Sequence, residues 1–329
     1  MQLPKQLKQA IEAEAARFGR ATLAQAASEL SDNYRFRQSG NHKFMATAAH
    51  RIAYAATRMP ATYAAIHKVF REIQWPVTSL LDLGAGPGTA AWAAAEMFAE
   101  LQTITLLERD QELIALGKSF AAQSNHAALR TAKWSAEDLT LTAVLPRHDV
   151  VICSYALGEL SNQMARTVVQ AAWQATEQFL VFIEPGTMKG FALIRELRDQ
   201  LIRGGGHILA PCPHAQSCPM PENDWCHFAA RVERSALHRQ LKAGARGYED
   251  EKFSYLIIAK HFAQSALRAR ILRRPNLQAG FVQLSLCTSE GLQKATVTRR
   301  NKDDFKRARK ADWGEAWRGS LTTEKIKQD

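Results

Sequence analysis

The chain has 329 residues, 46% of them hydrophobic, and a formal net charge of +11. This is enough to bury a full core, in one large domain or in one domain with additions. No uninterrupted apolar run reaches about 18 residues, which excludes a membrane span. Glu12, Glu14 and Glu29 argue against an organelle transit peptide. We therefore expect a cytoplasmic protein of bacterial type that acts as a monomer.

Residues 1–75 are expected to form an N-terminal helical region. Alanine-rich stretches with helical periodicity cover 7–30 and 50–73, and residues 31–41 look like their connection.

From residue 76 onward, short apolar runs alternate with helical stretches. The runs predicted as strands are 79–83, 103–107, 149–154, 179–183 and 253–259. Strands that alternate with helices imply right-handed crossovers and a mostly parallel sheet. We therefore assign an α/β fold to a domain at 76–262, with a cysteine-bearing insertion at about 204–246.

The remaining chain is assigned to two further segments. Residues 263–317 form a basic β extension, in which 281–286 and 294–298 pair as a hairpin around Ser289-Glu290-Gly291. Residues 318–329 are polar and are expected to be a loose tail.

The first predicted strand runs directly into a glycine loop, Gly84-Ala85-Gly86-Pro87-Gly88, and then into an alanine-rich helix. Glycines allow close approach of a ligand to the backbone, and the helix N-terminus favours an anion such as the methionine carboxylate. Dinucleotide sites use G-x-G-x-x-G, whereas this loop has G-x-G-x-G preceded by Asp82. The pattern favours S-adenosylmethionine on a class I methyltransferase Rossmann-like sheet. A dinucleotide site and an empty, vestigial fold are the alternatives.

Two further acids fit this site. Glu108 ends the next strand, 24 residues after Gly84, where a carboxylate accepts hydrogen bonds from ribose hydroxyls. Glu137 or Asp138 follows the third strand, where an acid often binds the adenine amino group. The residues assigned to the cofactor are Asp82, Gly84, Ala85, Gly86, Gly88, Glu108, Asp138 and Ser154.

Three of the five cysteines, Cys212, Cys218 and Cys226, crowd into fifteen residues with the spacing C-x5-C-x7-C, and Cys287 follows 61 residues later. Four thiolates suit a tetrahedral zinc or an iron–sulfur cluster. The paired C-x2-C of zinc ribbons is absent, but His214 and His227 keep a Cys3His zinc site open. Chance clustering is the remaining alternative. Cys153 lies inside an apolar strand and is assigned to packing.

Positive charge is concentrated in one region. Residues 231–310 contain 19 Lys and Arg against 7 Asp and Glu, so the rest of the chain is close to neutral. Such a concentration favours a polyanionic partner, nucleic acid first, although a solvated surface is the alternative. The residues assigned to phosphate contacts are Arg231, Arg234, Arg299, Arg300, Lys306, Arg307, Arg309 and Lys310. Arg231 and Arg234 are expected on a helix that follows the cysteine segment.

Seven motifs resemble one known family. They are LDLGAGPG at 81–88, SYALGEL at 154–160, EPG at 184–186, PCPH at 211–214, WCHF at 225–228, EKFSYL at 251–256 and ARKADWG at 308–314. Together they resemble the methyltransferase-like ribosomal small-subunit family first named from mitochondria (protein twenty-two of that set), from about residue 51 to 313. The resemblance implies a 4Fe–4S cluster held by Cys212, Cys218, Cys226 and Cys287. It also implies binding to the small ribosomal subunit through its rRNA during assembly.

The sequence assigns no catalytic residue. Methylation of a base amine usually needs an Asn/Asp-Pro-Pro-Tyr/Phe clamp after the fourth strand, where this chain has Ser154-Tyr155-Ala156-Leu157. The expected function is therefore binding of S-adenosylmethionine and small-subunit rRNA in support of ribosome assembly or translation. An active rRNA methyltransferase is the alternative.

Overall fold

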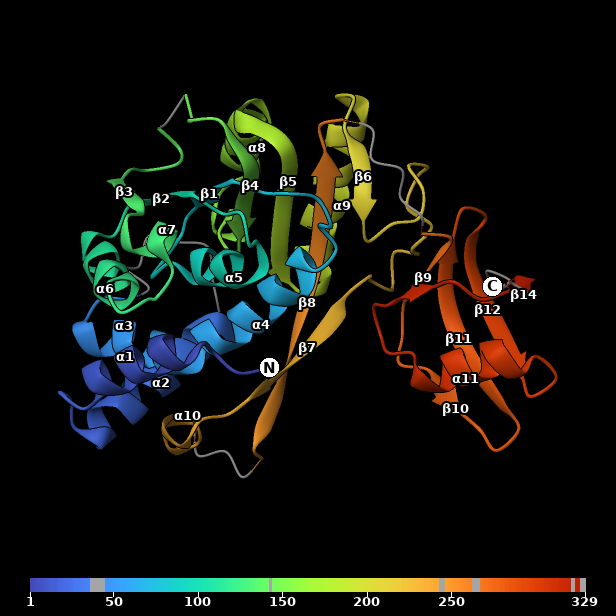
Figure 1. Cartoon of the computed structure of the whole chain (residues 1–329), viewed down its shortest axis with the longest axis horizontal. Helices are drawn as coiled ribbons and strands as arrows, with labels where there is room; N and C mark the ends of the chain where they lie inside the picture. Colours follow the sequence, from blue (N-terminus) through green and yellow to red (C-terminus); the bar gives the residue numbers. More distant parts are fainter. Residues whose placement is uncertain (36–44, 142–143, 243–245, 262–266, 321–322, 326–329) are drawn as a thin grey trace. The chain divides into compact units, whose positions relative to one another are not determined.

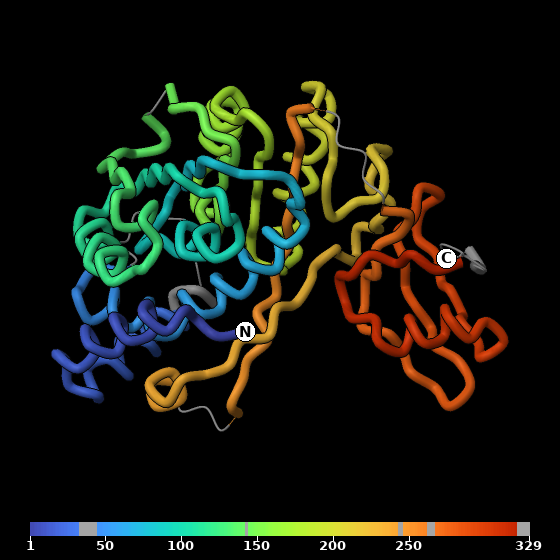
Figure 2. Tube along the Cα trace, in the orientation of Figure 1, coloured from blue at the N-terminus to red at the C-terminus, as the bar shows by residue number. Residues whose placement is uncertain are grey.

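The computed structural model describes residues 1–35, 45–141, 144–242, 246–261, 267–320 and 323–325. The chain forms two compact units (Figure 1). Unit 1 comprises Met1–Glu177 and Ala230–Glu251, and unit 2 comprises Gln178–Ala229 and Lys252–Asp329. Along the trace in Figure 2, the chain passes from unit 1 to unit 2 after Glu177, returns to unit 1 for Ala230–Glu251, and then passes to unit 2 again.

Unit 1 begins with four helices, drawn in blue in Figure 1: α1 (Lys5–Ala15), α2 (Arg20–Arg35), α3 (Ala48–Thr57) and α4 (Met59–Phe70). Each of the two expected helical stretches is thus divided in two. Arg58 separates α3 from α4, and Pro60 stands in the first turn of α4, where its missing N–H costs nothing. The predicted helical region is confirmed, but residues 31–35 belong to α2, and 36–41 of the expected connection lie outside the described residues.

A parallel sheet follows in unit 1, with the strand order β3-β2-β1-β4. Its strands are β1 (Ser79–Leu83), β2 (Thr103–Glu108), β3 (Lys133–Ala136) and β4 (His148–Ser154). Three helices lie between these strands: α5 (Thr89–Met97), α6 (Gln111–Ala121) and α7 (Ala127–Arg130). The short 3-10 turn η1 (Leu157–Glu159) and α8 (Asn162–Ala175) follow β4. Because β2 and β4 flank β1 on opposite sides, the carboxyl end of β1 is a topological switch point, where α/β sheets bind ligands.

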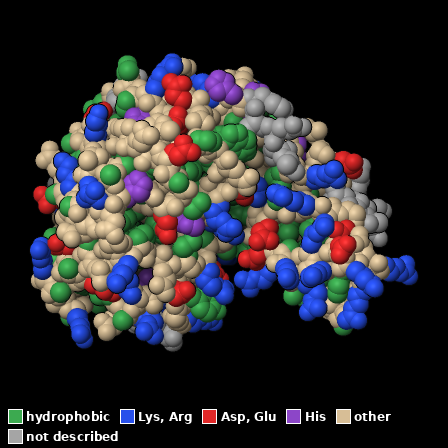
Figure 3. Space-filling model, viewed as in Figure 1, with side chains coloured by type: hydrophobic (Ala, Val, Ile, Leu, Met, Phe, Trp, Pro, Cys, Tyr) green, Lys and Arg blue, Asp and Glu red, His purple; other side chains and the backbone are tan. Residues whose placement is uncertain are grey.

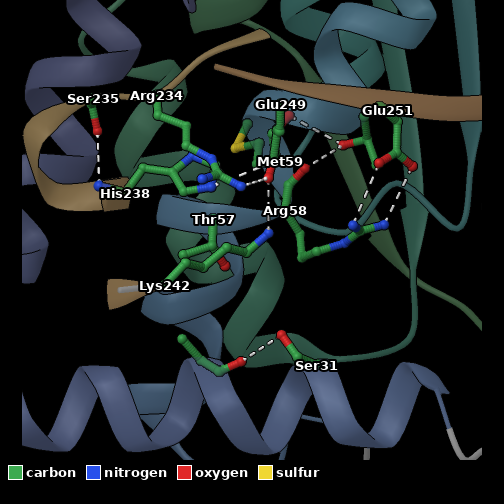
Figure 4. Close-up of polar contacts among 12 residues, drawn as sticks. Ser31, Thr57, Arg58, Met59, Arg234, Ser235, His238, Lys242, Glu249 and Glu251 are labelled. Carbon is green, nitrogen blue, oxygen red and sulfur yellow. Dashed lines mark hydrogen bonds and ion pairs between the residues drawn. The ribbon is translucent and has the colours of Figure 1, made fainter. Parts of the chain in front are cut away.

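A hairpin tip completes unit 1. It contains the ends of β7 (Phe228–Glu233) and β8 (Tyr248–Ala259), with α10 (Ala236–Leu241) between them. Glu249 accepts from Arg234 at 2.9 Å and Lys242 at 3.3 Å, and its other oxygen lies 3.4 Å from His238 (Figure 4). Burial alone would raise the pKa of Glu249, but His238 and Lys242 lower it to about 2. A carboxylate surrounded by cations thus holds the tip together.

The same tip is tied to the N-terminal helices. Arg58, between α3 and α4, lies 3.4 Å from a carboxylate oxygen of Glu251 (Figure 4). The amide of Glu233 donates to the carbonyl of Met1 at 2.9 Å. These contacts explain why the segment 230–251 belongs to unit 1.

Unit 2 contains two sheets. In the first, β5 (Thr176–Pro185) and β6 (His207–Ala210) pair antiparallel with β8 on its two sides, and α9 (Met188–Arg203) connects β5 to β6. The second has the order β13-β9-β11-β12-β14, with β10 beside β11. Its strands are β9 (Ala269–Ile271), β10 (Asn276–Leu277), β11 (Phe281–Thr288), β12 (Gly291–Thr298), β13 (Ala316–Trp317) and β14 (Thr323–Lys325).

A last helix, α11 (Lys302–Lys310), packs its Ala308 and Phe305 against the apolar core of the second sheet, which includes Val282, Leu286 and Trp317. The basic side chains of α11 lie on the other face and are exposed. This amphipathic division follows from the helical period, because residues three or four apart share one face.

The predicted α/β fold is confirmed, with three differences. The sheet is mixed rather than mostly parallel, because β8 runs antiparallel to its neighbours. The tail is not wholly loose, because residues 323–325 pair with β12 through backbone hydrogen bonds as β14. Arg231 and Arg234, expected on a helix, lie on β7 and directly after it. The four-segment division of the chain stays a prediction, and among the described residues no helix is long and apolar enough to cross a membrane.

Candidate functional site

The glycine loop of unit 1 follows β1 at the switch point. Gly84 has φ +70°, and a Cβ there would lie 2.8 Å from the Cβ of Ala156. Gly88, with φ +83°, would place a Cβ 3.1 Å from the Trp134 ring. Both positions therefore need glycine, for their backbone angle and for the close approach of neighbouring side chains.

Gly88 is also the N-cap of α5 and, as a glycine, supplies no side-chain cap to the first turn of this helix. Uncapped N–H groups and the helix dipole attract a negatively charged group. A carboxylate of a bound ligand fits this position.

Asp82, in β1, is a buried acid. Its side chain is 1% exposed, and neither oxygen has a hydrogen-bond partner among the described residues. Burial, with a further contribution from the charge of Glu108, raises the pKa of Asp82 to about 8. A buried acid without a partner is costly, so the structure favours a ligand that brings a donor or a positive charge.

Glu108, at the end of β2, fixes the loop from the other side. Its two oxygens accept from the amides of Gly86 and Asp110, each at 2.9 Å. Each carboxylate oxygen keeps a second lone pair, so Glu108 can still accept from hydroxyl groups of a ligand.

The other predicted cofactor residues lie in the same unit. One oxygen of Asp138 accepts from the amide and hydroxyl of Thr140, which lowers the pKa of Asp138. Ser154 is half-buried at the end of β4. Tyr155, directly after it, has φ +58°, a strained angle for a residue with a side chain. The sequence could not reveal this strain, although it did single out Tyr155 by its place after the fourth strand.

Unit 2 contains a cavity of about 40 Å³ lined by Cys212, Cys218, Cys226 and Cys287. The first three come from the stretch between β6 and β7, and the fourth comes from β11. The structure therefore brings together residues far apart in the chain. Within the described ranges, no three His, Cys, Asp or Glu side chains are close enough to hold a single metal ion, so the metal assignment stays a prediction.

Two of the cavity cysteines are disfavoured as free anions. Burial and the other cysteines hold the pKa of Cys226 well above its usual value. Burial, with Cys212 and Cys218, raises the pKa of Cys287 to about 12. Without a metal these two residues are thiols, and a bound metal would have to displace their protons.

The two histidines of the cysteine segment differ. His214 lines the cavity, and its Nε2 lies 3.6 Å from the sulfur of Cys287. His227 is not among the lining residues; it stacks on Trp225 with ring centroids 5.1 Å apart and meets Trp313 edge-on at 4.9 Å. Of the two, His214 is therefore the available alternative ligand.

Two buried arginines beside the cysteines were missed from the sequence. Arg198 lies on the buried face of α9, which also presents Ile194 and Leu201, and Arg270 lies between Ala269 and Ile271 in β9. A basic residue within an apolar helix face or strand is the signal that could have identified them.

The predicted phosphate-binding residues fall into two groups. In unit 1, Arg234 is bound to Glu249, and Arg231 pairs with Asp250 at 2.7 Å. The others lie at the end of β12 and on α11 of unit 2 and are exposed: Arg299, Arg300, Lys306, Arg307, Arg309 and Lys310. Figure 3 shows blue side chains gathered over this C-terminal part of unit 2. The exposed group is the better placed to contact phosphates.

The chain matches a family described as "Mitochondrial small ribosomal subunit Rsm22" over residues 48–318. It is 28% identical, over 289 residues, to the "Ribosome assembly protein METTL17, mitochondrial" of Homo sapiens, covering 80% of this chain and 61% of that protein. It is 23% identical, over 323 residues, to the "Rsm22-cox11 tandem protein 2, mitochondrial" of Schizosaccharomyces pombe, covering 80% of this chain and 42% of that protein. The chain thus spans less than two thirds of the length of these relatives.

Solved structures resemble the chain only distantly. A putative RNA methyltransferase from Pyrococcus horikoshii aligns with 73% of this chain and 98% of its own, at TM-score 0.40 and 11% identity. A magnesium protoporphyrin IX methyltransferase from Synechocystis with bound SAM aligns with 70% of this chain and 91% of its own, at TM-score 0.40 and 12% identity. Scores of this size carry no conclusion about function.

Proposed function

This chain belongs to the Rsm22 family, and we propose that it binds S-adenosylmethionine and small-subunit rRNA and supports assembly of the small ribosomal subunit. The observation that carries the proposal is the family match over residues 48–318, which includes the glycine loop, the cysteines and the basic helix. The human relative is named a ribosome assembly protein, and we extend that role to this chain.

The glycine loop is the proposed site of S-adenosylmethionine, which when bound supplies a methyl group on a positively charged sulfur. The first turn of α5 would receive its carboxylate, and Glu108 its ribose hydroxyls. The unpartnered carboxylate of Asp82 supports a ligand that carries positive charge as well.

The cysteine cavity is the proposed site of a 4Fe–4S cluster, with zinc as the alternative. The ligands would be the thiolates of Cys212, Cys218, Cys226 and Cys287. A water molecule needs about 10–15 Å³ of such space, so a cavity of about 40 Å³ supports a group larger than one ion. When bound, the cluster would bond β11 to the segment between β6 and β7 and so contribute directly to the folding of unit 2.

The rRNA site of the proposal is the basic face of α11 with Arg299 and Arg300. Its side chains are exposed and clustered on one side of the helix, opposite the buried Ala308. Such a surface binds the phosphate backbone with strong salt dependence and little sequence preference. Two further parts of the proposal come from the sequence: the protein acts as a monomer and resides in the cytoplasm.

Deleting the gene tests the assembly role. We expect small-subunit precursors to accumulate on sucrose gradients, the tagged protein to sediment with them, and the intact gene to restore mature subunits. Normal subunit profiles in the deletion strain, with no protein in the precursor fractions, would contradict the proposal.

The alternative is an active rRNA methyltransferase. The strained backbone of Tyr155, which directly follows β4, favours the methyltransferase alternative. Backbone strain of this kind is concentrated at active sites. Mapping the methylated nucleotides of rRNA in the deletion strain separates the two functions. A lost methyl group that a Tyr155→Phe variant fails to restore favours catalysis, and an unchanged map favours assembly alone.

A further inference from the structure

Arg51 of α3 forms an ion pair with Asp110, close in sequence to the predicted ribose-binding acid. Its Nε and one terminal nitrogen donate to the two carboxylate oxygens of Asp110 at 3.0–3.3 Å. The side chains of Arg51 and Asp110 are 15% and 28% exposed, so solvent screens this pair less than a fully exposed one. The pair therefore ties α3 to the start of α6.

The helix that supplies Arg51 is itself held in place. The side chain of Thr47 caps α3 by accepting from the amide of His50. Ile52 and Ala53, the two residues after Arg51, are 4% and 0% exposed. The guanidinium group is thus presented from a packed helix, which can fix the position of its partner.

Asp110 uses the same carboxylate as the N-cap of α6. Its Oδ1 accepts from the amides of Glu112, at 2.9 Å, and Leu113, at 3.3 Å. The backbone amide of Asp110 donates to Oε1 of Glu108 at 2.9 Å. An N-cap side chain fixes the backbone at the start of its helix. The direction of the Asp110 amide therefore depends on where its carboxylate is held.

Glu108 continues this network to the glycine loop. Its second oxygen, Oε2, accepts from the amide of Gly86 at 2.9 Å. A continuous series of polar contacts thus joins Arg51, Asp110, Glu108 and Gly86. The positive charge of Arg51 also offsets the repulsion between the carboxylates of Asp110 and Glu108.

We propose that Arg51 is a positioning residue for the ligand of the glycine loop: acting through Asp110, it holds the carboxylate of Glu108 where it accepts the ribose hydroxyls. The inference rests on the proposed S-adenosylmethionine site. Hydrogen bonds weaken steeply away from their preferred length and angle, so residues that orient a binding side chain from behind contribute to affinity. The N-terminal helical region thus takes part in ligand recognition through one side chain.

The test is calorimetric titration of the full-length protein with S-adenosylhomocysteine and with its 2′,3′-dideoxy analogue, which lacks both ribose hydroxyls. Arg51→Gln removes the charge and keeps a hydrogen-bond donor. We expect it to weaken S-adenosylhomocysteine binding about fivefold and binding of the analogue by less than about twofold, because residues of one hydrogen-bond network are coupled. A merely structural role of Arg51 would weaken both ligands by the same factor. Arg51→Lys, which keeps the charge, should lie between the wild type and Arg51→Gln.

Arg58→Gln is the matched control. Arg58 follows the last residue of the same helix and forms an ion pair of similar exposure, with Glu251 at 3.4 Å. This variant should leave the affinity for both ligands unchanged. Should Arg51→Gln fail to fold, Asp110→Asn replaces it with the same expected result. Its amide oxygen can still cap α6, but the charge that Arg51 binds is lost.

The wild-type affinities separate the two ways to fail. Wild-type protein that binds neither ligand overturns the S-adenosylmethionine site and this inference together. Wild-type protein that binds S-adenosylhomocysteine, with both affinities changed by one factor or unchanged in Arg51→Gln, overturns the inference alone. A wild type that binds the two ligands equally well does the same. Fully additive losses of binding free energy in an Arg51→Gln/Glu108→Gln double variant would also overturn it, because the two residues would then act independently.

Discussion

The glycine loop and the cysteine cavity differ most in their electrostatics. Next to the loop, in β1, Asp82 is a buried acid whose oxygens have no hydrogen-bond partner among the described residues, and its pKa rises to about 8. At the cavity, Arg198 and Arg270 are buried cations, and none of the described residues that line it is Asp or Glu. The two sites therefore bury side chains of opposite charge, an acid at the loop and cations at the cavity.

The two proposed groups also differ in the sign of their charge. S-adenosylmethionine carries a positive sulfur, and a cluster held by four thiolates carries negative charge. A third region shows what a balanced site looks like, because Glu249 in the hairpin tip is surrounded by Arg234, His238 and Lys242. There the charges satisfy one another within the protein, and no ligand is needed.

The largest expected effect comes from the cavity. Cys226→Ser should lower the iron content of anaerobically purified protein below about a tenth of the wild-type value, because a ligand is lost from a site whose binding energy is folding energy. Metal analysis checks this, and faster proteolysis of unit 2 should accompany it. Cys153→Ala, in β4 of unit 1, is the control and should keep its iron. Equal iron in both variants would remove Cys226 from the ligand set.

The next effect concerns the basic face of α11. Four exposed residues of the helix are changed to glutamine together: Lys306, Arg307, Arg309 and Lys310. The slope of log K against log salt should become shallower by about 3 for a small-subunit rRNA fragment, because each of the four phosphate contacts contributes about 0.7–0.9. Filter binding over a salt series measures it. Four exposed basic residues of unit 1 provide the control: Lys5, Arg20, Lys118 and Lys133. An equally large change of slope in the control variant would show that the binding is not specific to the basic face of α11.

Asp82→Asn tests the electrostatics of the glycine-loop site. The raised pKa means that between about pH 4 and pH 8 the folded state holds a proton that the unfolded state has released, so this acid lowers stability as pH rises. The variant should therefore be more stable than the wild type without ligand, by on the order of 1–3 kcal/mol at pH 8 and less toward pH 4. Thermal unfolding across this range measures the gain.

The same variant should bind S-adenosylmethionine about tenfold more weakly, because a hydrogen bond to a charged group is lost. Calorimetry checks this at pH 8. A stability gain that does not change with pH would show that the charge of Asp82 is not its cause.

Glu249→Gln should have the smallest effect on either site. It leaves Arg234 and Lys242 without their acid and should destabilise the protein by about 1–3 kcal/mol at neutral pH. The folded pKa is lowered, so the contribution of Glu249 is present above about pH 4.5 and is lost as pH falls toward 2. Denaturant unfolding measures it, with Glu177→Gln, a solvent-exposed partner of Arg147, as the neutral control. A loss of iron or of ligand binding in Glu249→Gln would contradict the view that the charged residues of the hairpin tip act independently of both sites.

The two sites differ in how far they could be predicted. The glycine loop is local: β1, the loop and α5 follow one another within 20 residues, so spacing alone placed Asp82 and Gly84. The cavity depends on long-range packing. Its cysteines were found because cysteine is rare, but Arg198 and Arg270 are common residues brought there by α9 and β9. No local sequence pattern predicts that these two arginines lie beside the cysteines. For the same reason the antiparallel direction of β8 was not foreseen.

The metal content of the wild-type protein, purified without oxygen and measured with its absorption spectrum, is the most direct test of the proposed iron–sulfur cluster. We expect a coloured protein with about four iron atoms per chain. A colourless protein that contains one zinc and no iron would contradict it.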